Sequence, residues 1–92
     1  MGIYREVFDL AAKVGSLEGY LYVFPEEAPR YFTNWLGNIQ RMYAALPKEV
    51  RDDCRSSFLE TFGKAVEHME KLPNAGEENL RLAKQILAEA TG

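Results

Sequence analysis

The side chains of this chain best suited to catalytic chemistry are those of its single cysteine, Cys54, and its single histidine, His68. A thiol acts as a nucleophile when a histidine within about 3 Å takes up its proton. Both residues fall in one predicted helix, fourteen positions apart, and this spacing corresponds to about 21 Å along a helix axis. We therefore expect no nucleophile–base pair: Cys54 is interpreted as a small core residue, and His68 as a residue at the boundary of the core.

The histidine and cysteine content also argues against a metal centre. Structural and catalytic zinc sites draw three or four ligands from Cys, His and carboxylates, and one Cys with one His falls short of the usual sets. A di-iron bundle needs Glu-x-x-His on two helices, whereas the residue three before His68 is Ala65. Gly15 and Gly19 lack the following Lys-Ser/Thr of a phosphate-binding loop. The sequence predicts no catalytic residue, no metal and no cofactor, hence a protein that is not an enzyme.

Composition narrows the classes of partner. The chain has 92 residues, a net charge of −3 and 47% hydrophobic residues. Its eleven basic residues are scattered, which disfavours nucleic acid as a partner, and no apolar run approaches the roughly 20 residues of a membrane span. A single cysteine excludes an internal disulfide and fits a reducing compartment. We expect a cytoplasmic protein that binds neither nucleic acid nor membranes.

The element around which the chain is organised is the helix predicted over residues 29–46. Pro29 suits a first helical turn and Pro47 stops the helix. Between them, large apolar residues recur at steps of three and four, the spacing of one helical stripe. These residues are Phe32, Trp35, Ile39, Met42 and Leu46. Such a stripe has to be buried against other helices.

Three further helices are predicted, over residues 3–24, 48–72 and 77–90. Each carries its own apolar stripe, and turns of two to six residues join the four helices. Short turns favour antiparallel neighbours. The sequence therefore predicts an all-α single domain over residues 1–92, folded as an up-and-down antiparallel four-helix bundle. At about 1.5 Å per residue, the last helix should end about 15 Å short of the third and leave part of the groove between the longer helices uncovered.

The first helix carries a second face made of small and aromatic residues. These are Tyr4, Phe8, Ala11, Ala12, Gly15, Gly19 and Tyr22. A helix that is apolar or small on two faces usually packs on both, against either a neighbouring helix of the same chain or another molecule. Two glycines cost about 1 kcal/mol each in a helix, so a break near Gly15–Ser16 stays open at this stage.

Two functions follow from these features. The first is a non-enzymatic bundle that acts by protein–protein association, most simply as a homodimer through the second face of the first helix, with the uncovered end of the longer helices as the other candidate surface. The alternative is a ligand-binding or sensor module, since helical bundles host apolar pockets. The residues predicted to line that pocket are Tyr31, Trp35, Phe58 and Phe62.

Overall fold

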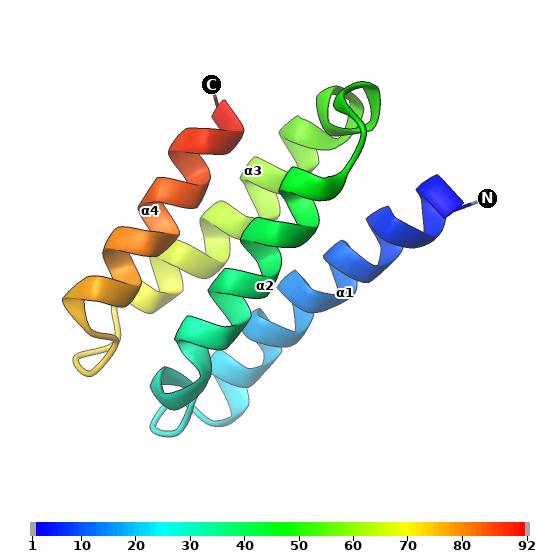
Figure 1. Cartoon of the computed structure of the whole chain (residues 1–92). Coiled ribbons are helices and arrows are strands. Elements are labelled where there is room, and N and C mark those ends of the chain that lie inside the picture. Colours follow the sequence, from blue (N-terminus) through cyan, green and yellow to red (C-terminus); the bar gives the residue numbers. More distant parts are fainter. Residues whose placement is uncertain (1, 92) are drawn as a thin grey trace.

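The structure is a computed structural model that describes residues 2–91, and the side chains of residues 5–91. Within this range it contains four α-helices and a short 3-10 helix that precedes the second of them (Figure 1). The elements are α1 (Gly2–Val23), η1 (Ala28–Tyr31), α2 (Phe32–Ala45), α3 (Lys48–Glu70) and α4 (Glu77–Thr91). The predicted all-α class and four-helix bundle are confirmed.

Helix α1 runs without interruption through Gly15 and Gly19 to Val23. Its buried stripe explains why the glycines do not break it. Leu17 and Leu21 are fully buried, and Leu10 and Val14 are nearly so. Burying one such side chain is worth about 1.5–3 kcal/mol, whereas each glycine costs about 1 kcal/mol relative to alanine. Tertiary burial therefore outweighs the local preference.

The second predicted helix begins later than expected. Residues Ala28–Tyr31 form the 3-10 turn η1, and regular α-helix begins only at Phe32. Pro25 and Pro29 disfavour helical backbone at the residues before them. The side chain of Ala28 is fully buried under the turn, so the turn is anchored in the core before α2 begins.

Successive helices run in opposite directions, and the order around the bundle is α1, α2, α4, α3. The main contacts link α1 with α2, α2 with α4, α4 with α3, and α3 with α1. Two hydrogen bonds join α2 to α4 as parallel neighbours: the Thr33 hydroxyl lies 3.1 Å from the Asn79 amide oxygen, and Gln40 donates to Glu89 at 2.9 Å. Helices α2 and α3 are joined by a two-residue turn yet lie diagonally across the core. The bundle is thus two helical hairpins packed side by side.

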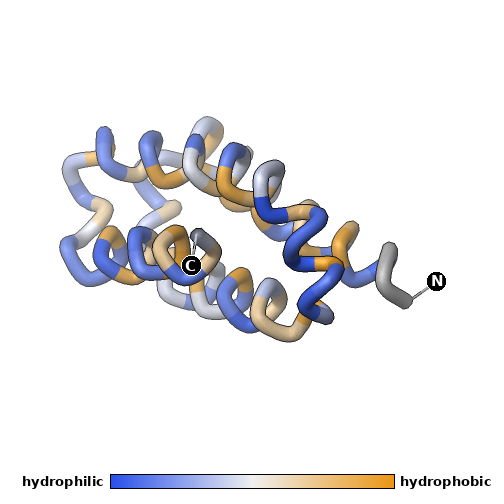
Figure 2. Tube along the Cα trace, turned by 90° about the horizontal axis from the view of Figure 1, so that it is seen from above, coloured by the Kyte–Doolittle hydropathy of each residue, from blue (hydrophilic) through white to orange (hydrophobic). Residues whose placement is uncertain are grey.

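The core takes one stripe from each helix, and hydrophobic residues recur turn by turn along all four (Figure 2). Its largest fully buried side chains are Phe32, Phe62, Leu17, Leu21, Leu36, Ile39, Met69, Ile86 and Val14. The buried face of α2 differs in detail from the predicted stripe: Leu36 and Tyr43 are buried, whereas Trp35 and Met42 are half-buried. This face is turned toward α4 as well as α1, because α2 packs against both.

The turn before α4 is fixed by backbone geometry. Ala75 is buried, and its carbonyl oxygen accepts a hydrogen bond from the Asn79 amide at 2.9 Å. Gly76 follows with φ = 92°, the one positive φ among the described residues. Residues other than glycine are strained at a positive φ of this size.

In the part of the chain described here, no helix combines the length and apolarity needed to cross a membrane.

Two glycine substitutions test this account of the backbone. Gly76→Ala is expected to lower the free energy of unfolding by about 1–2 kcal/mol, because an L-residue disfavours positive φ. Gly63→Ala, in the middle of α3, is the matched control: an added Cβ there meets no atom within 4 Å, so the higher helix propensity of alanine should raise stability by about 0.5–1 kcal/mol. Urea unfolding followed by circular dichroism measures both. Equal effects of the two substitutions would contradict the assigned turn.

Candidate functional site

The second face of α1 is open to solvent. Phe8 is 72% exposed and Tyr22 is 71% exposed, and Ala11, Ala12, Gly15 and Gly19 between them are exposed as well. A Cβ built on either glycine would meet no neighbouring atom within 4 Å. Among the described residues, other helices reach only the edge of this strip, where Tyr22 contacts His68 of α3 and Ala11 borders α3, so packing within the chain leaves most of the strip uncovered. Tyr4, also predicted for this face, lies outside the residues whose side chains are described.

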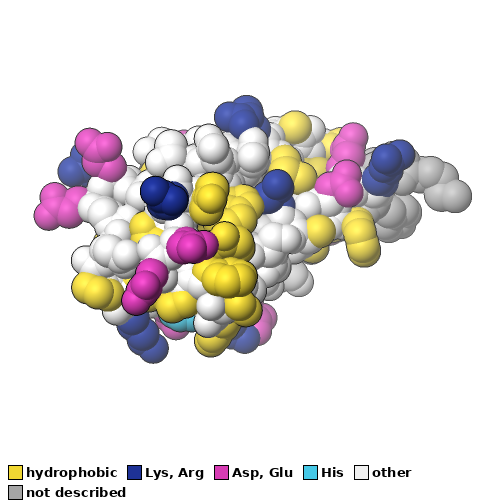
Figure 3. All heavy atoms as spheres, turned by 90° about the horizontal axis from the view of Figure 1, so that it is seen from below, with side chains coloured by type: hydrophobic (Ala, Val, Ile, Leu, Met, Phe, Trp, Pro, Cys, Tyr) yellow, Lys and Arg dark blue, Asp and Glu magenta, His cyan; other side chains and the backbone are white. Residues whose placement is uncertain are grey.

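We call these six described residues, Phe8, Ala11, Ala12, Gly15, Gly19 and Tyr22, the α1 strip. Its C-terminal end is supported by α3, since the ring of Tyr22 lies 4.3 Å from that of His68 between centroids, tilted by 56°. Exposed apolar residues continue past it: Val23 is 66% exposed, Phe24 48% and Tyr31 43%. Figure 3 shows hydrophobic side chains gathered on the underside of the bundle, with scattered charged side chains beside them.

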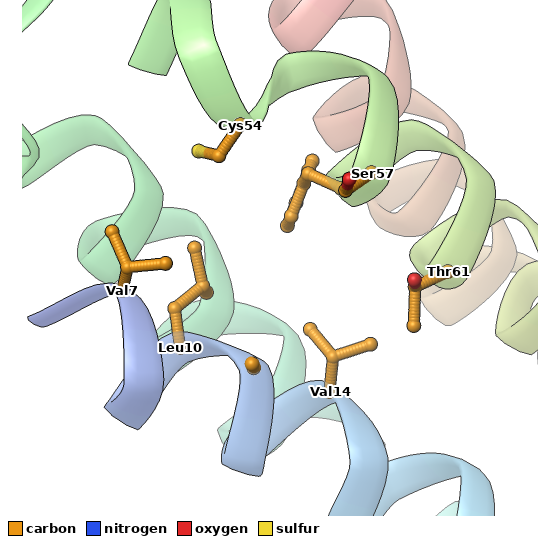
Figure 4. Close-up of a pocket in the computed structure, with 8 residues that line it drawn as sticks. Val7, Leu10, Val14, Cys54, Ser57 and Thr61 are labelled. Carbon is orange, nitrogen blue, oxygen red and sulfur yellow. The ribbon is translucent and has the colours of Figure 1, made fainter. Parts of the chain in front are cut away.

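A small apolar groove opens beside the strip, between α1 and α3. Its volume is about 100 Å³, and side chains of the two helices face each other across it (Figure 4). The lining residues are Val7, Leu10, Ala11, Val14, Cys54, Ser57, Phe58 and Thr61. Ala11 belongs both to the groove and to the α1 strip, so the two form one continuous surface. The sequence predicts an uncovered groove between the longer helices, and α1 and α3 are the two longest. Its lining by the small residues Cys54, Ser57 and Thr61 of α3 was not predicted.

Cys54 lies in the groove wall and is half-buried. Burial raises the pKa of its thiol, and the sulfur lies 3.8 Å from the carbonyl oxygen of Arg51 in its own helix. Helix α3 is continuous from Lys48 to Glu70, so Cys54 and His68 stay about 21 Å apart along its axis. Within a single copy of the chain they do not form a catalytic pair.

The described side chains offer little else for catalysis or metal binding. No group of three or more His, Cys, Asp or Glu residues among them lies close enough to hold a metal ion, and none of their polar or charged residues is fully buried. The ion pairs are on the surface, as between Lys64 and Glu60 at 3.6 Å. Such exposed pairs contribute little to stability.

The four residues predicted to line a ligand pocket fall into two separate aromatic groups. Tyr31 and Trp35 pack edge-on at 5.7 Å, together with Tyr20 at the α1–α2 side. Phe58 and Phe62 stack on each other at 5.4 Å inside the core. Of the four, only Phe58 lines the groove between α1 and α3. Helix α2 is rotated about its axis relative to the predicted stripe, and Trp35 is therefore half-buried at the edge of the bundle, apart from Phe58 and Phe62.

The other candidate surface, the end of the longer helices that the sequence predicts to be uncovered, is partly covered by α4. Ala90 near the end of α4 lines a cleft with Lys48 and Arg51 at the start of α3, so α4 reaches almost to that end. Arg55 in the same cleft bonds Asp52 at 2.6 Å, and this bond raises the pKa of the guanidinium. Among the described residues, the exposed large hydrophobic side chains lie on α1 and on the segment that follows it, at Phe24 and Tyr31.

Comparisons with protein-family models, with curated proteins and with solved structures give no match to the chain.

The raised pKa of Cys54 predicts that its thiol reacts slowly with disulfide reagents. Because only the thiolate reacts, a disulfide reagent at pH 8 should modify folded protein roughly three- to tenfold more slowly than urea-unfolded protein. The fold favours the neutral thiol, so the free energy of unfolding should fall as the pH rises past the ordinary thiol pKa. Cys54→Ala is the control and should lose that part of the pH dependence. Equal rates in folded and unfolded protein would contradict the half-buried position.

Proposed function

We propose that this protein acts by self-association, as a homodimer formed through the α1 strip. The observation that carries the proposal is the pair of large aromatic residues, Phe8 and Tyr22, which are more than 70% exposed at the two ends of a run of small residues. Contiguous exposed apolar surface on a soluble domain marks an interaction site. Tyr is also among the residue types enriched in interface hot spots.

The gain from covering this strip is substantial. Fully burying one phenylalanine-sized side chain is worth about 1.5–3 kcal/mol, and each protomer offers Phe8, Tyr22 and the neighbouring Val23. Between them, Gly15 and Gly19 project no side chain, so a partner helix meets little steric resistance there. A small domain buries only about 60–65% of its unfolded surface, which makes a second layer of burial valuable.

The proposal places the protein among non-enzymatic interaction proteins. The ion pairs of the described chain lie on the surface, and the α1 strip is made of apolar and small residues. The single cysteine fits a reducing compartment, and we propose the cytoplasm. A small ligand in the α1–α3 groove is the second candidate, favoured by the apolar lining of the groove. The groove adjoins the strip, so a partner that covers the strip also covers its mouth.

Solution mass tests the proposal directly. Wild-type protein is expected to have twice the monomer mass of 10.5 kDa in light scattering at micromolar concentration. The double substitution Gly15→Leu and Gly19→Leu should convert it to monomer, because the leucines block the strip. Neither position has a neighbouring atom within 4 Å, so the fold itself should be kept or stabilised by about 1 kcal/mol per glycine replaced.

The matched control is Ser16→Leu, an exposed position on the charged side of α1, which should leave the dimer intact. Circular dichroism confirms that each variant is folded. A wild-type monomer would refute self-association, and a dimer that survives the two leucines would move the interface away from the α1 strip.

A further inference from the structure

The α1 strip is nearly symmetric about Gly15. Phe8 stands seven positions before Gly15 and Tyr22 seven positions after it, and Ala11 and Gly19 stand four positions before and after. At about 100° per residue, the six residues of the strip lie within roughly 100° of the helix circumference. From this pattern we propose that α1 packs antiparallel on the α1 helix of a second copy, with the two helices crossing at Gly15. The inference rests on the proposed self-association and specifies its geometry.

In an antiparallel pair, residues at equal distances from the crossing point face each other. Phe8 then meets the partner's Tyr22, so each end of the interface holds one aromatic pair. Ala11 meets the partner's Gly19, and Gly15 meets its own copy on the twofold axis. A twofold interface has to be complementary to itself. Five of the six strip residues satisfy this condition, with large residues facing large ones and small residues facing small ones, whereas Ala12 is at the level of the partner's Glu18.

Charge complementarity points to the same partner and the same direction. Arg5, ten positions before Gly15, reaches the level of the partner's Pro25, next to the acidic residues Glu26 and Glu27. All three charged side chains are exposed, and none is in an ion pair within the described chain. A parallel pair would instead place Arg5 at the level of the partner's Arg5, and the acidic turn beside its own copy.

The groove between α1 and α3 also finds an occupant in this arrangement. Ala11 lines the groove and Tyr22 touches His68, so both lie on the edge of the strip nearer to α3. A twofold axis perpendicular to the two helices brings these edges together. Helical side chains lean toward the N-terminus of their own helix, so the partner's Tyr22 leans from the level of Phe8 toward Ala11, over the mouth of the groove.

Disulfide crosslinking distinguishes the directions, in a Cys54→Ser background. With axes about 8–10 Å apart and Cα atoms about 2.3 Å from each axis, facing Cα atoms come within about 6 Å, which a disulfide spans. Gly15→Cys should crosslink to more than half under a glutathione redox buffer. Gly19→Cys alone should not crosslink above the level of Ser16→Cys, which controls for random collisions. A mixture of Ala11→Cys protein with Gly19→Cys protein should give the heterodimer.

The outcomes separate the orientation from the association itself. Efficient crosslinking of Gly19→Cys alone means that Gly19 faces its own copy, as in a parallel pair, and overturns the antiparallel crossing at Gly15 while the dimer stands. A dimer by light scattering in which neither Gly15→Cys nor the mixture crosslinks places the interface elsewhere and also overturns it. A Cys54→Ser protein and a wild type that are both monomeric by light scattering refute the dimer together with its geometry.

A charge exchange provides an independent test. Arg5→Glu should weaken the dimer about tenfold at low salt, because it faces the partner's Glu26 and Glu27. Adding Glu26→Lys and Glu27→Lys to the same chain should restore the wild-type dissociation constant, measured by sedimentation at several concentrations. Weakening by Arg5→Glu that the two lysines do not reverse, or no weakening at all, would contradict the proposed pairing of these charges.

Discussion

The core of this bundle accepts one apolar stripe from each helix, and α1 carries two faces that lack charge. Leu10, Val14, Leu17 and Leu21 occupy the core, and with these four residues buried the strip on the other side of α1 stays exposed over most of its length. The packing of the other helices depends on which face of α1 is buried. Helices α2 and α3 both pack on that face, and α4 packs on α2 and α3. The exposed strip is therefore a direct consequence of how the core is filled.

The order of the helices decides where the surface remains open. Because α4 packs between α2 and α3, the α1–α2 and α3–α4 hairpins lie side by side and α1 has α3 as a parallel neighbour. The residues of α3 that face α1 near its start are small, as at Cys54, Ser57 and Thr61, and they leave the groove of about 100 Å³ between the helices. Side chains of this size do not reach far enough to fill it, so the groove continues the surface of the α1 strip.

The charged residues lie mainly on the surface of the bundle. No polar or charged residue among those described is fully buried, and the pKa shifts have local causes. For example, amide groups of Gln40 and Gln85 donate to Glu89 and lower its pKa. Catalytic sites usually combine burial with a specific charged partner, whereas here the distinctive surface is apolar. This contrast is why we propose association, with Phe8 and Tyr22 as anchors.

The sequence by itself determined the helical class, the approximate bounds of the four helices and most of the core, because apolar spacing of three and four residues is a local property of the chain. It also identified the α1 strip through Phe8, Gly15 and Gly19. It did not decide whether another helix of the chain covers that strip, nor that α4 separates α2 from α3, since both depend on contacts between residues far apart in sequence. The placement of Trp35 away from Phe58 and Phe62 has the same origin: the rotation of a helix about its axis is set by all of its neighbours together. The left-handed turn at Gly76 and the buried alanines at positions 28 and 75 likewise acquire their roles only once the helices have packed.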